Sequence, residues 1–162
     1  MSARRLYVAA TWVPRRETIV VGSLGPITFV RGWYAYVGSA RRGRDARVAR
    51  HRRAAKPLRW HADYLFSRHP AGRAWLVDTR VSECELAARL GGRVVPRFGS
   101  SDCRCGGHLV WLPRLADLRR GLTAGVADDE RPVQHTAGER PRPHDDGQPP
   151  SPQIVHPDRR QW

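Results

Sequence analysis

The sequence contains few cysteines, few acidic residues and no long apolar run. No apolar stretch among its 162 residues approaches the roughly 18 residues that a transmembrane helix requires, so a membrane-spanning protein is excluded. The apolar run at residues 6–13 is short, and Arg15 and Arg16 follow it where a signal peptide has small residues, so we expect a cytoplasmic protein. Three cysteines cannot form a disulfide framework, so reduced thiols or metal ligands are expected.

Charge and proline are distributed unevenly along the chain. Residues 1–122 carry 24 basic and 8 acidic side chains, a net charge of +16, whereas residues 123–162 carry 5 basic and 7 acidic side chains, a net charge of −2. The second segment also holds 7 of the 13 prolines and has almost no aliphatic periodicity. Such a segment cannot bury enough apolar surface to offset its ordering entropy. We therefore predict a folded domain at residues 1–122 and a disordered tail at residues 123–162.

Alternating apolar patterns and turn residues predict an α/β domain, with a small mixed or antiparallel central sheet flanked by helices. Strands are expected at residues 6–13, 18–21, 27–30, 33–38, 73–79 and 108–112, and helices at residues 42–55 and 82–90. In the fourth strand, Tyr34 and Tyr36 lie on one face and Trp33, Ala35 and Val37 on the other, because side chains alternate along a strand.

Residues 41–59 form a strongly basic segment, with nine basic side chains and one acidic side chain, Asp45. Such a concentration of charge repels itself unless a polyanion neutralises it, so a nucleic acid is the expected partner, although a solvated helix face is the simpler alternative. The side chains expected to contact the phosphate backbone are Arg41, Arg42, Arg44, Arg50, Arg52, Arg53 and Lys56. The charge pattern gives no preference for a base sequence.

Three cysteines and one histidine could supply four zinc ligands: Cys84, Cys103, Cys105 and His108. The spacing of Cys103 and Cys105 differs from the common zinc knuckle, which has two to four residues between its cysteines. The sequence therefore favours reduced, buried thiols that pack the last loop over a zinc site.

The chain resembles the GIY-YIG nuclease superfamily in two motifs, Tyr36-Val37-Gly38 at a strand end and a helical segment that begins with Arg47 and ends with His51. More closely, it is similar to a poorly characterised branch of that superfamily, which is sometimes fused to an endonuclease III-like domain. Three ordered blocks carry this resemblance, at residues 32–40, 60–65 and 98–105.

The resemblance implies a divalent-metal-dependent endonuclease that acts in the repair or processing of nucleic acid, with DNA the expected substrate. Its catalytic residues would be Tyr7, Tyr36, Arg47, His51 and a glutamate that holds Mg²⁺ or Mn²⁺. Tyr7 departs from the family pattern, because Arg5 and Leu6 precede it and because its interval to Tyr36 is longer than in typical members.

Helical geometry selects Glu83 for the glutamate that the resemblance requires. Ser82 and Glu85 have the spacing of a capping box, which would hold Glu85 at the helix N-terminus. Glu83 shares a face with Leu86 and Leu90, which should point inward, and a buried carboxylate is costly unless it is paired or bound to a cation. Glu83 is therefore the predicted Mg²⁺ ligand, with a partly exposed partner of the helix dipole as the alternative.

The block at residues 60–65 has two interpretations. On a strand, His61 and Asp63 would share a face and could form an oriented pair beside the site. On a helix they would not, and a buried hydrogen-bonded brace is the interpretation that we favour.

Three functions remain open at this level. The first is the metal-dependent endonuclease, and the second is a nucleic-acid-binding module with the same fold and no catalysis. The third is a zinc-stabilised interaction domain whose basic surface is incidental. The oligomeric state cannot be predicted from the sequence.

Overall fold

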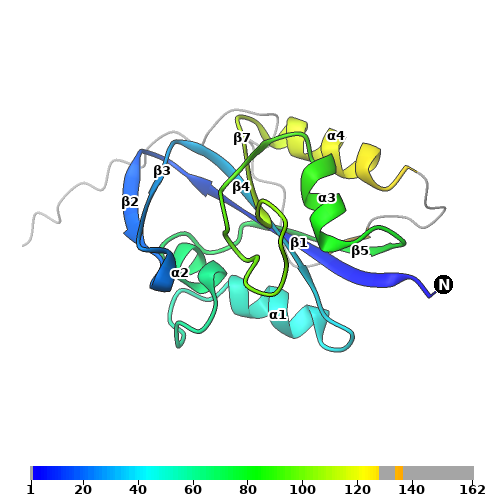
Figure 1. Cartoon of the computed structure of the whole chain (residues 1–162), viewed down its shortest axis with the longest axis horizontal. Coiled ribbons are helices and arrows are strands. Elements are labelled where there is room, and N and C mark those ends of the chain that lie inside the picture. Colours follow the sequence, from blue (N-terminus) through cyan, green and yellow to red (C-terminus); the bar gives the residue numbers. More distant parts are fainter. Residues whose placement is uncertain (1, 128–133, 137–162) are drawn as a thin grey trace, which may run out of the picture.

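A six-stranded sheet forms the centre of the computed structural model, which describes residues 2–127 and 134–136 (Figure 1). Its strands are β1 (Arg4–Val13), β4 (Gly32–Ser39), β5 (Arg73–Thr79), β6 (Arg93–Val94), β7 (Leu109–Leu112) and β8 (Gln134–His135). They lie in the order β6-β7-β4-β1-β5-β8, and every neighbouring pair is antiparallel. The predicted α/β class is therefore confirmed, with an antiparallel rather than a mixed sheet.

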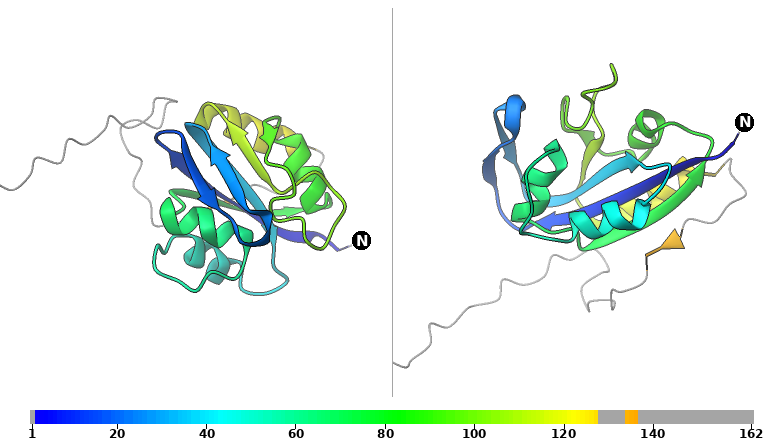
Figure 2. Two further views of the ribbon diagram at one scale, coloured as in Figure 1. Left: turned by 60° about the vertical axis from the view of Figure 1, so that its left-hand side comes forward. Right: turned by 90° about the horizontal axis from the view of Figure 1, so that it is seen from below.

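A separate two-stranded hairpin and four helices complete the described part of the chain. The hairpin consists of β2 (Glu17–Val20) and β3 (Pro26–Phe29), joined by the short 3₁₀-helix η1 (Gly22–Leu24). The helices are α1 (Arg44–His51), α2 (His61–Arg68), α3 (Glu83–Arg89) and α4 (Leu115–Gly125). Figure 2 shows the hairpin projecting away from the main sheet.

The central strands are buried on both faces, so the sheet separates two apolar cores. Alternate residues of β1 enter different cores, with Leu6 and Val8 on one face and Tyr7 on the other. Helices α3 and α4 cover the first face. Helices α1 and α2, the hairpin and Phe98 cover the second face (Figure 2). The second face, which contains Tyr7, carries the candidate site.

The ends of the helices follow local chemistry. Ser82 caps α3 and forms the predicted capping box with Glu85, so that prediction is confirmed. Helix α1 is shorter than predicted, because it begins after Gly43, whose φ of 72° is left-handed, and ends at His51. Beyond it, Lys56 Nζ donates hydrogen bonds to the carbonyl oxygens of Arg50 and Arg53, at 2.9 Å each.

The folded unit extends past the boundary that composition predicts at residue 122. Helix α4 continues to Gly125, because Leu122 and Val126 are buried in the first core. Residues 134–135 then form the edge strand β8 beside β5. Residues 128–133 and 137–162, where most of the predicted disordered tail falls, lie outside the described residues.

None of the helices within the described ranges has the length and apolar character that crossing a bilayer requires.

Candidate functional site

The two predicted catalytic tyrosines lie side by side on adjacent strands. Tyr7 of β1 is directly opposite Gly38 of β4, and Tyr36 lies two residues before Gly38, so both side chains leave the same face of the sheet. Their ring centroids are 6.4 Å apart. Tyr7 is only 2% exposed, whereas Tyr36 is partly exposed. A Cβ at position 38 would lie 2.5 Å from Tyr7 Cζ, so the ring can cross β4 only over a glycine.

The long sequence interval between the two tyrosines is explained by the hairpin of β2 and β3. This hairpin lies between β1 and β4 in the chain but pairs only within itself, so it leaves the two strands adjacent. The departure from the family spacing therefore does not separate Tyr7 from Tyr36.

His51, the last residue of α1, closes the site from the helical layer. Its ring centroid lies 5.6 Å from the centroids of both Tyr7 and Tyr36, and its Nε2 shares a 3.1 Å hydrogen bond with the Tyr7 hydroxyl. His51 is fully buried, and burial lowers its pKa to about 3. The imidazole is therefore neutral at physiological pH and serves the phenol as a hydrogen-bond partner.

Arg47 and Glu83 place opposite charges near the two phenols. Burial raises the pKa of Tyr7 well above its ordinary value; the charge of Glu83 adds to this effect, and the charge of Arg47 opposes it. Burial, followed by the negative charge of Glu83, raises the pKa of Tyr36 to about 12. Both phenols are therefore protonated unless a further positive charge is brought in. All five predicted catalytic side chains belong to one electrostatic cluster, built from β1, β4, α1 and α3.

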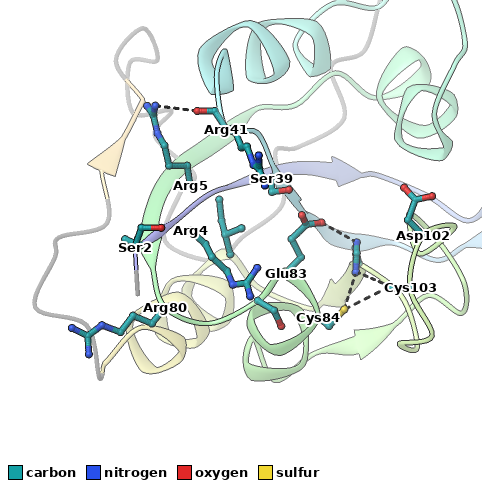
Figure 3. Close-up of a pocket in the computed structure, with 15 residues that line it drawn as sticks. Ser2, Arg4, Arg5, Ser39, Arg41, Arg80, Glu83, Cys84, Asp102 and Cys103 are labelled. Carbon is teal, nitrogen blue, oxygen red and sulfur yellow. Dashed lines mark hydrogen bonds and ion pairs between the residues drawn. The ribbon is translucent and has the colours of Figure 1, made fainter.

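Glu83 is the first residue of α3 and lines a cleft of about 930 Å³. Its side chain is 29% exposed, whereas Leu86 and Leu90 on the same helical face are buried, as predicted. Figure 3 shows its carboxylate near the centre of the cleft, with Ser39 on one side and Cys84 on the other. Basic residues also line the cleft: Arg4, Arg5, Arg41 and Arg80. A phosphate that enters would meet an acid, which can hold a cation, surrounded by guanidinium groups.

Two arginines that the sequence assigns to nucleic-acid binding have structural roles, which corrects that assignment. Arg44 is buried, forms a 2.9 Å salt bridge with Asp78 and donates a hydrogen bond to the carbonyl oxygen of Leu6. Arg50 forms a two-pronged pair with the fully buried Asp63, with N···O distances of 3.1 and 2.8 Å. A basic run in a sequence does not reveal which of its members will pair with an acid in the fold.

The other basic side chains of this segment differ in their availability. Arg41, Arg42 and Arg53 are exposed. Arg52 donates a hydrogen bond to the Thr136 hydroxyl, and Lys56 is bound to the helix-end carbonyls. The exposed arginines are therefore the best candidates for contact with a phosphate backbone.

The block at residues 60–65 forms the start of α2, and its His61 and Asp63 have different hydrogen-bond partners. Asp63 accepts hydrogen bonds from the backbone N–H groups of Arg59 and Trp60 as well as from Arg50. Burial alone would raise the pKa of Asp63, but these hydrogen bonds outweigh it and hold the pKa below its usual range. His61 Nδ1 accepts a hydrogen bond from the Gly99 backbone at 3.1 Å. The favoured interpretation, a hydrogen-bonded brace, is confirmed.

Trp60, which has no predicted role, lies beside this brace and contacts Arg47. The Trp60 ring lies 4.9 Å from the guanidinium carbon of Arg47 and 4.8 Å from that of Arg50, and it is 40% exposed. Cation–π contact on one aromatic ring thus links the predicted catalytic arginine to the ion pair with Asp63.

The four predicted zinc ligands converge at the cleft, and three of them, Cys84, Cys103 and His108, form part of its lining. Their ligand atoms, from Cys84, Cys103, Cys105 and His108, all lie within 4.8 Å of one another. The three cysteines are free thiols, and they are partly rather than wholly buried.

A family model described as "Domain of unknown function DUF123" matches residues 6–128. No curated protein and no solved structure matches the chain.

Proposed function

Since the chain belongs to the DUF123 family, whose description states no activity, we propose its function from the site itself. We propose a divalent-metal-dependent endonuclease that hydrolyses phosphodiester bonds in nucleic acid, with DNA the expected substrate. The observation that carries this proposal is the contact of Tyr7, Tyr36 and His51, with Arg47 and Glu83 near enough for their charges to act on both phenols. The resemblance of the motifs to the GIY-YIG nuclease superfamily supports the same reaction.

The donor set fits Mg²⁺ or Mn²⁺. Mg²⁺ keeps several of its waters and is commonly held by one or two carboxylates together with substrate phosphate oxygens. Glu83 supplies one partly exposed carboxylate inside a cleft that is large enough for those waters and a phosphate. When bound, the cation would stabilise negative charge on the scissile phosphate and on the leaving oxygen.

The chain's own residues can perform the proton transfers of hydrolysis. The Tyr7 phenolate, which Arg47 and a bound cation would favour, takes a proton from the attacking water, while Nε2 of the neutral His51, 3.1 Å away, hydrogen-bonds to the Tyr7 oxygen and holds it in place. The resulting hydroxide forms the new P–O bond, the bond to the leaving oxygen breaks, and a proton from solvent neutralises that oxygen. Tyr36 orients the water from the adjacent strand.

Arg47 clamps the phosphate during these steps. A guanidinium stays charged throughout the reaction and offers two parallel N–H donors to phosphate oxygens, which lysine cannot reproduce. Trp60 holds this guanidinium in place before substrate arrives, so little orientation has to be gained during binding.

The test is cleavage of plasmid, branched and single-stranded DNA in the presence of Mg²⁺ or EDTA. We expect cleavage that requires Mg²⁺ and is lost in Glu83→Gln and in Arg47→Ala. Glu85→Gln is the matched control for the acid, because it lies on the same helix and is exposed, and because glutamine also completes a capping box. Arg53→Ala is the control for the arginine; it removes an exposed charge from the same basic segment.

The alternative is a nucleic-acid-binding module without catalysis, and the same experiment separates the two. Salt-sensitive binding with no cleavage of any substrate would favour the module and reject the enzyme. For duplex DNA, the logarithm of affinity should fall against the logarithm of salt concentration with a slope of about 0.9 per phosphate contact. Failure to bind any nucleic acid at low salt would reject both.

A further inference from the structure

The cluster of three cysteines and one histidine joins three separated parts of the chain. Cys84 lies in the first turn of α3, Cys103 and Cys105 lie in the loop between β6 and β7, and His108 immediately precedes β7. These three cysteines are all that the sequence contains. Figure 3 shows Cys84 and Cys103 on the same side of Glu83.

The ligand atoms of the cluster lie close enough together to share one metal ion, although Cys103 Sγ and Cys105 Sγ, at 3.0 Å, are closer than in a regular tetrahedral zinc site. Cys84 Sγ lies 3.6 Å from Cys103 Sγ, and Cys103 Sγ lies 3.0 Å from Cys105 Sγ. Nε2 of His108 lies 3.4 Å from both Cys84 Sγ and Cys103 Sγ. Zinc bonds of about 2.3 Å to sulfur and about 2.0 Å to nitrogen place neighbouring ligand atoms roughly 3.5–3.8 Å apart in a tetrahedron. A disulfide, in contrast, requires about 2.05 Å between two sulfurs.

The loop between β6 and β7 is held internally by backbone hydrogen bonds, among them one from the Arg97 N–H to the Gly106 carbonyl oxygen at 2.7 Å, and the Cys/His cluster would add a link to α3. Residues 95–108 contain no helix and no strand, and most of their side chains from Pro96 to Gly106 are at least partly exposed. Loops of this length without secondary structure are uncommon in small domains and are usually either functional or disordered. Phe98 is buried in the second core and anchors the loop near its start. The Cys/His cluster provides a second anchor near its end.

The chemistry of the donors selects the metal. Three thiolates and one imidazole are soft or borderline ligands, which bind Zn²⁺ and not the hard, oxygen-seeking Mg²⁺. A set of four protein ligands leaves no open position, as in structural zinc sites.

The second nitrogen of the histidine connects this cluster to the catalytic acid. His108 Nδ1 is buried and faces Glu83 Oε2 at 3.4 Å, while Nε2 faces the sulfurs. A histidine that binds zinc through one nitrogen commonly donates the N–H of the other to a carboxylate, which fixes the orientation of both groups. Glu83 stands in the position of that carboxylate.

We propose that Cys84, Cys103, Cys105 and His108 form a structural Zn²⁺ centre that fastens the loop at residues 95–108 onto α3, and that Glu83 supports it through His108. This centre stands on its own geometry, whether or not the chain cleaves nucleic acid.

The experiment is metal analysis and thiol titration of the full chain, purified without chelator. We expect about one equivalent of zinc after dialysis. The three thiols should react slowly with a thiol reagent until a strong chelator removes the metal. Cobalt added to the metal-free protein should give the visible spectrum of a tetrahedral site with sulfur ligands. Less than about 0.1 equivalent of zinc with no cobalt spectrum, or fewer than three free thiols in denatured protein, would overturn the proposal.

Variants separate the zinc ligands from their neighbours. Cys105→Ser should lose stoichiometric zinc, whereas Asp102→Asn, an exposed change in the same loop, should retain it. If Cys105→Ser does not fold, the cobalt titration of the unaltered chain still decides. Glu83→Gln should keep one equivalent of zinc but bind it about 10- to 100-fold more weakly, as measured by competition with a chromophoric chelator. Unchanged zinc affinity in Glu83→Gln would remove the link to Glu83 and leave cleavage to be judged separately.

Discussion

Replacing Tyr7 by phenylalanine tests whether its hydroxyl serves catalysis or only packing. The change removes one oxygen from a ring that is 2% exposed and leaves the ring itself in place. That oxygen is the hydrogen-bond partner of His51 Nε2, and Nδ1 of the same buried imidazole has no partner among the described residues. Tyr7→Phe therefore leaves both ring nitrogens unsatisfied. We expect a loss of about 1–3 kcal/mol in the free energy of unfolding.

The expected loss of cleavage is larger than this loss of stability can explain. Domains of this size have an unfolding free energy of about 5–15 kcal/mol, so the variant remains mostly folded. Removing a general base slows a reaction by about 10²- to 10⁴-fold, which corresponds to roughly 2.7–5.5 kcal/mol in the barrier. The assay is the single-turnover cleavage rate at saturating protein, measured beside urea denaturation of the same preparation.

Tyr34→Phe is the matched control. Tyr34 is equally buried, lies on the same face of the sheet, and donates its hydroxyl to the Val30 carbonyl oxygen at 2.9 Å. This variant therefore loses a comparable hydrogen bond outside the proposed catalytic cluster, and its cleavage rate should equal that of the unaltered chain. A Tyr7→Phe variant that cleaves as fast as Tyr34→Phe would refute the role of the Tyr7 hydroxyl.

Three further changes test the surroundings of the site. Gly38→Ala places a Cβ against the Tyr7 ring and should cost about 1–3 kcal/mol of stability in urea denaturation, whereas Gly106→Ala, which meets only ordinary contacts, should cost less. Asp63→Asn leaves Arg50 without its buried counter-charge and should lower the unfolding free energy by about 3–5 kcal/mol; an effect below about 1 kcal/mol would contradict the brace. Burial lowers the pKa of His51 to about 3 in the folded chain, so between pH 6.5 and 3 the unfolded chain binds a proton at His51 that the folded chain does not. Acidification through this range should therefore reduce the free energy of unfolding by up to about 1.4 kcal/mol per pH unit. His51→Gln should lack this component of the pH profile.

Local patterns predicted the secondary structure best where side chains alternate strongly. The strand at residues 73–79 and the capped helix at Ser82 follow from period and capping chemistry alone. The edge strands β6 and β8 have two residues each, which is too short for any period to appear. Helix α4 crosses the predicted boundary because the composition of residues 123–162 as a whole conceals Val126, which continues the apolar face of Leu122.

The arrangement of the site depended on contacts between distant segments, which a single sequence does not contain. The sequence could name Tyr7 and His51, but not that a neutral imidazole 44 positions away shares a hydrogen bond with that phenol. The sequence could list basic residues, but only the fold shows that Arg50 forms a salt bridge with Asp63 and that Arg44 forms one with Asp78. Whether an arginine can bind a phosphate therefore depends on whether the fold places an acidic side chain next to it.

Glu83 and Cys84 are consecutive residues, and each is proposed to serve a different metal centre. Consecutive helical residues point about 100° apart, so the first turn of α3 can direct Glu83 into the cleft and Cys84 towards the loop. His108 then connects the two directions, because its two ring nitrogens face the sulfurs and the carboxylate respectively. A metal that fixes the loop would also fix the acid, and loss of zinc should therefore weaken cleavage even though zinc takes no part in the reaction. Cleavage that is unaffected in a zinc-free, folded chain would show that the two centres are independent.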